Sequence, residues 1–188
     1  MSFKVIFVTL FAALSVIGLS ACSSDNPELK SFNSADVSFA QDMIPHHRQA
    51  TEMAKLAADR TKNPEVLDLA SKIIAAQQPE IDLMSGWLKS WDKEVPSASS
   101  SSSMPGMDHG SSDMPGMMSD EDMSALKDST DAAFDTMFLT MMIDHHKGAI
   151  EMAASEQTDG KYSHAVALAK KIQADQTKEI ATMESLLS

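Results

Sequence analysis

Two stretches decide the fold of this 188-residue chain, "MIPHHRQATEMA" at residues 43–54 and "MIDHHKGAIEMA" at residues 142–153. In each, Met-Ile precedes an adjacent pair of histidines, and Glu-Met-Ala follows at the same offset. The chain has six histidines, and four of them lie in these two stretches. An internal repeat is the simplest explanation of this pattern.

The repeat extends without a gap, at an offset of 99 residues, from Asp36 to the C-terminus. Its two copies cover about fifty residues each, and their apolar residues recur three and four positions apart, which predicts two amphipathic helices per copy. Two such helical hairpins cannot bury their apolar stripes alone. The sequence therefore predicts an all-α four-helix bundle with pseudo-twofold symmetry.

Helix starts are suggested by capping residues. Ser34 or Asp36 is expected to cap the first helix, and Pro64 suits the first turn of the second. Asp120 to Asp122 would place negative charge at the start of the third helix.

The chain also divides by composition. Residues 1–21 are typical of a secretory signal, and Leu19-Ser20-Ala21-Cys22 resembles a lipobox in which Cys22 is lipidated; the alternative is a plain secretory peptide with an incidental cysteine. The predicted organisation is a tether at 22–33 and a bundle at 34–188, comprising repeat one (34–93), a Met/Ser-rich linker (94–119) and repeat two (120–188).

The net charge and the numbers of cysteines and methionines limit which metal ligands and which binding partners are plausible. The formal net charge of −12 disfavours nucleic acid and anionic lipid headgroups as partners. Cys22 is the only cysteine, so disulfides and thiolate metal sites within the bundle are excluded. The chain has 15 Met but only seven Phe, two Trp and one Tyr, which makes methionine the candidate soft ligand.

The histidine pairs are the candidate metal ligands. Consecutive helical residues lie about 100° apart, so one histidine of a pair can face the core while the other points to a neighbouring helix. Imidazole and thioether together favour copper, especially Cu(I), and the alternative is that these side chains only fill the core. The candidate ligands are Met43, His46, His47, Met53, Met142, His145, His146 and Met152.

Four polar residues interrupt the apolar stripe of the second helix of each repeat: Gln77, Glu80, Gln176 and Glu179. A buried carboxylate needs a partner, and the histidines are the obvious one. Glu80 and Glu179 could hold imidazole N–H groups or take the metal directly. The alternative is that all four lie at the wet end of the bundle.

The linker repeats "MPGM" at 104–107 and 114–117. Its methionines could wrap Cu(I) or Ag(I) without a preformed cavity, or the segment could be a low-complexity spacer. The candidate linker ligands are Met104, Met107, His109, Met114, Met117 and Met118.

The paired "MI-x-HH-x-x-A-x-x-MA" and "Q-x-x-E-I-x-x-M" motifs resemble those of the bacterial domain-of-unknown-function family 305. That family has a ferritin-like bundle and includes CopM-like periplasmic copper-binding proteins. The resemblance covers about residues 34–93 and 120–188. It implies extracytoplasmic binding of Cu(I), with silver as a second ion, by the methionines and histidines of the two HH motifs.

We therefore expect a non-enzymatic, membrane-anchored lipoprotein that buffers copper or passes it to a trafficking partner. One alternative is a ferritin-like di-metal oxidoreductase, although Glu52 and Glu151 follow the histidine pairs on a different helix face. The other is a structural or protein-interaction bundle without metal.

Overall fold

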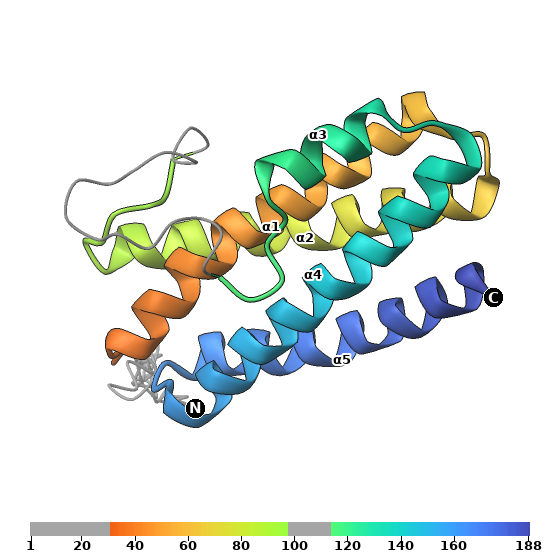
Figure 1. The fold of residues 1–188 in the computed structure, drawn as a ribbon. Helices are drawn as coiled ribbons and strands as arrows, with labels where there is room; N and C mark the ends of the chain where they lie inside the picture. Colours follow the sequence, from red (N-terminus) through yellow and green to blue (C-terminus); the bar gives the residue numbers. More distant parts are fainter. Residues whose placement is uncertain (1–30, 98–113) are drawn as a thin grey trace, which may run out of the picture.

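The computed structural model describes residues 31–97 and 114–188. Helices are the only regular elements among these residues: α1 (Ser34–Arg60), α2 (Pro64–Ser90), α3 (Asp120–Asp128), α4 (Asp131–Asp159) and α5 (Ser163–Leu187) (Figure 1). The predicted all-α bundle of two helical hairpins is confirmed, with α1 and α2 as the first hairpin and α4 and α5 as the second.

Each helix of the first hairpin begins at an asparagine N-cap. Asn33, rather than Ser34, is the N-cap of α1, and it forms a reciprocal capping box with Asp36. The prediction that Ser34 or Asp36 caps this helix is thus wrong, because Asn33 is the cap and Asp36 is its N3 partner. Asn63 caps α2 and Pro64 occupies the first turn, as predicted.

The second hairpin departs from the sequence prediction. One helix was expected from Asp120 onward, but the chain forms the short helix α3, breaks at Ser129 and Thr130, and starts again at Asp131. Asp131 has a φ of 52°, and Ser and Thr favour helix caps over helix interiors. The break lets α3 lie against α1 and α4, where Leu126 is completely buried in the core.

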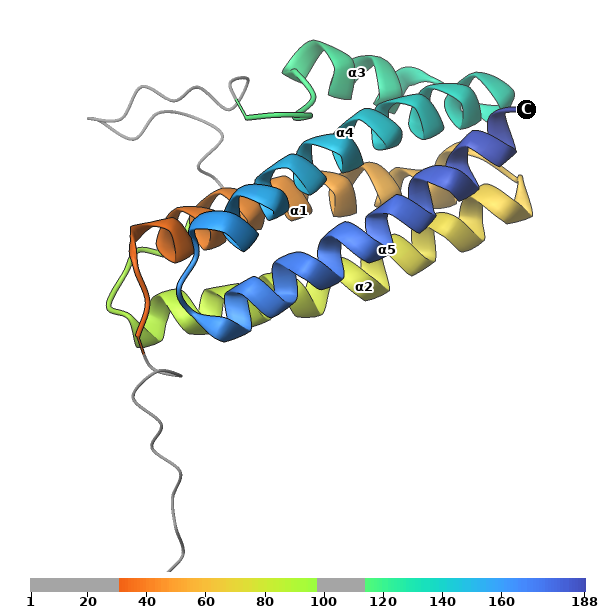
Figure 2. The same ribbon diagram turned by 90° about the horizontal axis from the view of Figure 1, so that it is seen from below.

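Packing is strongest within each hairpin and between α1 and α4. In Figure 2, α1 and α4 form one side of the bundle and α2 and α5 the other. The core consists of two apolar clusters. Cluster one contains Met53, Ile73, Leu126, Phe138 and Met142, and cluster two contains Phe39, Met43, Ile81, Trp87 and Ile172.

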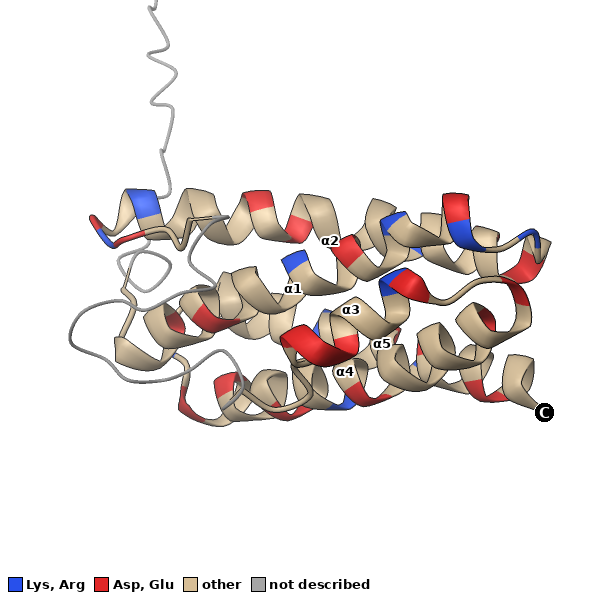
Figure 3. Cartoon of the chain, turned by 45° about the horizontal axis from the view of Figure 1, so that its top comes forward, with Lys and Arg blue, Asp and Glu red and all other residues tan. Residues whose placement is uncertain are grey.

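The surface is acidic and the linker is only partly separate from the bundle. Figure 3 shows acidic positions on the helices and at the start of α3. Residues 114–119, expected to belong to a flexible linker, instead pack on the bundle, because Gln49 binds Met118 and Met118 contacts cluster one. Within the described residues, no helix combines the length and apolar character needed to span a membrane.

Candidate metal centre

A layer of polar side chains separates the two apolar clusters. On every long helix it falls between the last residue of one cluster and the first of the other; on α2, for example, it lies between Ile73 and Ile81. We call these eight side chains the polar layer: His46, His47, Gln77, Glu80, His145, His146, Gln176 and Glu179. The wet-end alternative is wrong for Gln77, Glu80 and Gln176, which are buried, whereas Glu179 is partly exposed.

His46 and His145 meet at the middle of the layer, where α1 packs against α4. Their ring centroids are 3.7 Å apart and the rings are tilted by 40°. The two residues are 0% and 1% exposed, respectively. The equivalent first histidines of the two repeats thus contact each other, while the second histidines point to other helices, as the helical spacing predicts.

His47 and His146 each bind a glutamate on the second helix of their own hairpin. His47 Nε2 lies 2.8 Å from Glu80 Oε2, and His146 Nε2 lies 2.6 Å from Glu179 Oε2. Burial raises the pKa of Glu80, but the hydrogen bonds and charges of His47 and Lys171 outweigh it and hold the pKa below its usual value. The structure thus brings Glu80 and Glu179 into contact with imidazoles, as the first of the two roles predicted for them requires.

Burial keeps the central pair neutral. It lowers the pKa of His46 to about 3, with a further lowering from the charge of His47. Burial, followed by the charge of His46, also lowers the pKa of His145 well below its usual value. Neutral imidazole is the form that donates a lone pair to a metal, so burial preserves the ligand form of both rings well below neutral pH.

The layer is rich in buried polar atoms that form no hydrogen bond. They include Nδ1 of all four histidines, Nε2 of His145, both amide atoms of Gln77 and Oε1 of Gln176. Buried polar groups in proteins are almost always paired, and each unpaired one costs about 1–3 kcal/mol. Such a concentration of unpaired polar atoms, with several imidazole nitrogens among them, fits a site at one level of the bundle that is completed by a bound ion.

The four candidate methionines flank this layer. Met53 and Met142 belong to cluster one, while Met43 belongs to cluster two and Met152 packs against it, partly buried. The repeat thus places one methionine of each copy on either side of the histidines. Among the described residues, no three His, Cys, Asp or Glu side chains are arranged to hold a metal ion.

The linker candidates divide into two groups. Met104, Met107 and His109 lie outside the described residues. Met114, Met117 and Met118 lie beside the bundle, and all three are partly buried. Glu52 and Glu151 are exposed, in keeping with their expected separation from the histidines.

Sequence reasoning missed two contacts of the layer. The carbonyl oxygen of Pro115 lies 3.1 Å from His46 Nε2, and Lys171 Nζ lies 2.9 Å from Glu80 Oε1. The sequence carried a signal for the first one, because the two copies of the HH motif differ at Gln49 and Gly148, which both contact the segment around Pro115.

A four-helix bundle with a buried His, Gln and Glu layer between methionine-containing clusters defines a class of duplicated helical-hairpin proteins. Residues 36–187 match the model of the domain of unknown function DUF305, and the chain belongs to this family. The resemblance inferred from the HH motifs is thus confirmed.

Solved structures of this family share the fold. A DUF305 protein of Streptomyces coelicolor, described as secreted, is 32% identical, with a TM-score of 0.72 over 81% of this chain and 90% of that one. A DUF305 fragment from Deinococcus radiodurans is 28% identical, with a TM-score of 0.71 over 82% of this chain and 96% of that one.

CopM is similar as well. Its Cu(II)-bound form is 33% identical, with a TM-score of 0.67 over 81% of this chain and 95% of that one, and CopM has also been solved in Cu(I)-bound and Ag-bound forms. An uncharacterized protein of Acanthamoeba polyphaga mimivirus is 43% identical over 53 residues, which are 28% of this chain. The matched region spans about a third (35%) of that curated relative.

Proposed function

We propose that this protein is a non-enzymatic copper-binding protein that takes Cu(I), or Ag(I), at the polar layer. The observation that carries the proposal is the set of free histidine nitrogens buried at one level of the core. His46, His47, His145 and His146 would supply imidazole nitrogens, and Met43, Met53, Met142 and Met152 would supply thioethers. The similarity to CopM, which binds copper and silver, supports this choice of ion.

The surroundings of the layer support binding rather than catalysis. A di-metal oxidoreductase would use carboxylates as metal ligands, whereas Glu80 and Glu179 bind imidazoles and hold them in place. The flanking clusters are apolar and closely packed, which would exclude water from a bound Cu(I). We infer a role in buffering copper or passing it to a trafficking partner.

His145 offers the sharpest test, because neither of its ring nitrogens forms a hydrogen bond. Replacing it with Leu removes two unpaired buried nitrogens and leaves no orphaned partner, so the apo-protein should fold with equal or greater stability. If His145 is a ligand, Cu(I) affinity should fall by at least about tenfold. A competition titration with a Cu(I) chelator and a thermal melt on the same samples measure both effects.

His164 provides the matched control, since it is exposed and lies against Tyr162 outside the layer. His164→Ala should bind Cu(I) as the wild type does. Burial lowers the pKa of His46 to about 3, so this ring should still be available as a neutral ligand at pH 5. Wild-type affinity in His145→Leu would reject the layer as the site and leave the interaction-bundle alternative.

We also propose that the protein is extracytoplasmic and anchored by an acyl chain at Cys22. The lipobox resemblance of residues 19–22 supports this, as does the secreted description of the Streptomyces coelicolor protein. Cys22→Ala should move the protein from the membrane fraction to the soluble fraction. A wild-type protein whose intact mass contains no lipid would refute the anchor.

A further inference from the structure

Residues 114–118 form a strap that crosses the polar layer just before α3. Near its start, the carbonyl oxygen of Pro115 lies 3.1 Å from His46 Nε2. At its end, Gln49 holds Met118 through two bonds of 2.8 Å, one accepted from the Met118 backbone N–H and one donated to the Met118 carbonyl. The strap is thus bound to α1 at both ends.

Two glycines make room for the strap on α4. A Cβ atom on Gly148 would lie 1.9 Å from the carbonyl oxygen of Pro115. Gly116 has a φ of 77°, and a Cβ atom there would lie 2.6 Å from the carbonyl oxygen of Asp144. A side chain at either position is incompatible with the docked strap.

The two copies of the repeat differ at the strap and agree beside it. Gln49 and Gly148 occupy the same repeat position, in "HHRQA" and "HHKGA". The two preceding histidines and the following alanine are identical in the two copies. One strap crosses two helices that are related by pseudo-twofold symmetry, so the same residue cannot suit both contacts. On α1 the position is Gln49, which binds Met118, and on α4 it is Gly148, which leaves room for Pro115.

We propose that the strap is a positioning element that fixes the tautomer of His46. A backbone carbonyl can only accept a hydrogen bond, so the contact with Pro115 requires the proton of the neutral ring to lie on Nε2. The lone pair then lies on Nδ1, which is buried and forms no hydrogen bond. The inference that Nδ1 of His46 binds the metal rests on the proposed copper site. The assignment of the tautomer is independent of that site.

The same device recurs in the layer with different acceptors. Glu80 and Glu179 accept from Nε2 of His47 and His146, and the Nδ1 atoms of those rings are likewise free. The carbonyl oxygen of Pro115 thus accepts from Nε2 of His46, as the two glutamates accept from Nε2 of His47 and His146. Among the described residues, the strap offers no such carbonyl to His145, whose ring instead interacts with the backbone of His46, so the strap makes the two central histidines unequal.

The test displaces the strap without touching any histidine. Gly148→Ala would force Pro115 away from His46, and a helical alanine stabilises the helix itself. Gly86→Ala is the matched control, because Gly86 also lies in a long helix and a Cβ there meets nothing within 4 Å. Gln49→Ala is a second, independent variant that releases the Met118 end.

Two readouts separate the tautomer from the metal. In the apo-protein, two-bond 15N NMR spectra of histidine should show a single Nε2–H form of His46 in the wild type and in Gly86→Ala. The spectra should show a tautomer mixture in Gly148→Ala and Gln49→Ala, with the signals of His47 and His146 unchanged. Cu(I) affinity should fall about tenfold in the two strap variants, as expected when a partner of a metal-binding histidine is lost.

Each outcome decides one statement. An unchanged His46 spectrum in both strap variants overturns the inference. A changed spectrum with unchanged Cu(I) affinity overturns the link between the strap and the metal. A wild-type protein that binds no Cu(I) refutes the proposed function, whereas the tautomer assignment is still judged by the apo spectra.

Discussion

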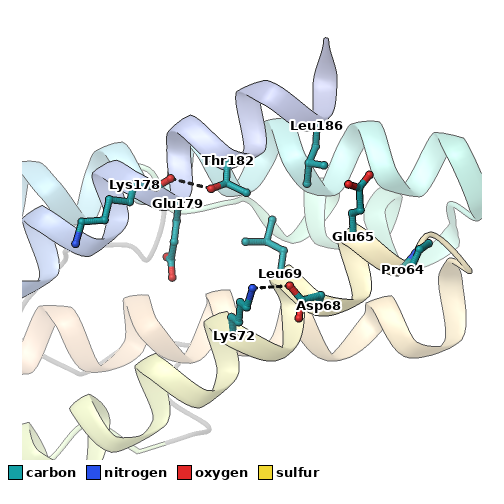
Figure 4. Close-up of a pocket in the computed structure, with 9 residues that line it drawn as sticks. All are labelled: Pro64, Glu65, Asp68, Leu69, Lys72, Lys178, Glu179, Thr182 and Leu186. Carbon is teal, nitrogen blue, oxygen red and sulfur yellow. Dashed lines mark hydrogen bonds and ion pairs between the residues drawn. The ribbon is translucent and has the colours of Figure 1, made fainter.

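The two histidine–glutamate pairs of the polar layer occupy equivalent repeat positions but differ in their surroundings. In repeat one, Glu80 accepts hydrogen bonds from His47 and from Lys171, which reaches across from α5. For Glu179 of repeat two, the lysine equivalent to Lys171 is Lys72 on α2, but it pairs with Asp68 at 2.6 Å instead of reaching Glu179. Figure 4 shows Lys72 turned toward Asp68, with Glu179 beside them.

Two substitutions between the repeats change the carboxylates around these lysines. The repeat position of Asp68 is occupied in the second copy by Ala167, and Lys171 pairs with Asp175 at 3.1 Å as well as with Glu80. The equivalent of Asp175 in repeat one is Ala76. Beside Glu179 lies a cavity of about 370 Å³, lined by residues of α2 and α5. The side chain of Glu179 is 21% exposed and that of Glu80 is 10% exposed. A duplicated motif thus yields one closed pair and one more accessible pair.

The largest effect should come from removing the two glutamates. Glu80→Ala leaves the buried His47 Nε2 without its acceptor and removes one of the two carboxylates that pair with Lys171, and should lower the free energy of unfolding by about 2–4 kcal/mol. Glu179→Ala strands only His146 at a partly wet site and should cost about 1–2 kcal/mol. Urea unfolding measures both, with the exposed Glu151→Ala as the control. Equal losses would contradict the difference between the pairs.

A second difference between the repeats predicts a dependence on pH. Glu156 is 1% exposed, whereas the equivalent residue of repeat one is the buried Ala57. Burial, followed by the neighbouring carboxylates of Asp36 and Asp159, raises the pKa of Glu156 to about 8. Asp42 lines a separate cavity of about 250 Å³ together with Glu156 and Asp159. The folded protein therefore holds a proton that the unfolded chain releases above the ordinary pKa of 4.5.

Because the folded-state pKa is raised, stability falls as the pH rises through about 8. We expect the free energy of unfolding to drop by about 1.4 kcal/mol between pH 7 and pH 9. Glu156→Gln cannot ionise, so most of this drop should vanish, while the exposed Glu151→Gln should retain it. Urea titrations at the two pH values measure the change. A pH-dependent loss that persists in Glu156→Gln would assign the titration to other groups.

The sequence predicted the elements that the repeat carries twice. The helical spacing and the matched residues were sufficient for the four long helices, the buried histidine pairs and the contacts of Glu80 and Glu179. These features depend on local periodicity and on the need to pair a buried carboxylate. Symmetry alone therefore brings the equivalent residues to one level of the bundle.

The features that break the symmetry could not be predicted in this way. The docking of Pro115 depends on space at Gly148, and the reach of Lys171 depends on the absence of a carboxylate at Ala167. Both are long-range contacts that the periodicity of one helix does not encode. The break between α3 and α4 was missed because the charged first turn at Asp120 was assigned to a long helix, although Ser129 and Thr130 are typical capping residues.

The smallest effect concerns the lysines themselves. Lys171→Ala removes ion pairs to the buried Glu80 and to Asp175 and should cost about 0.5–1 kcal/mol, an effect that weakens in 1 M salt because Lys171 is itself exposed. Lys72→Ala removes an exposed pair within one helix and should cost less than about 0.5 kcal/mol. Urea unfolding at low and high salt measures both.

Asp68→Ala sharpens this last comparison, because it gives repeat one the alanine found at the same position in repeat two. Lys72 would lose its partner on α2, and the nearest equivalent of the Lys171–Glu80 contact would then be a contact with Glu179 across the cavity. In the Asp68→Ala background, Lys72→Ala should become as costly as Lys171→Ala in the wild type, and as sensitive to salt. If Lys72→Ala stays neutral in that background, the difference between the pairs arises from the separation of α2 and α5 and not from competition by Asp68.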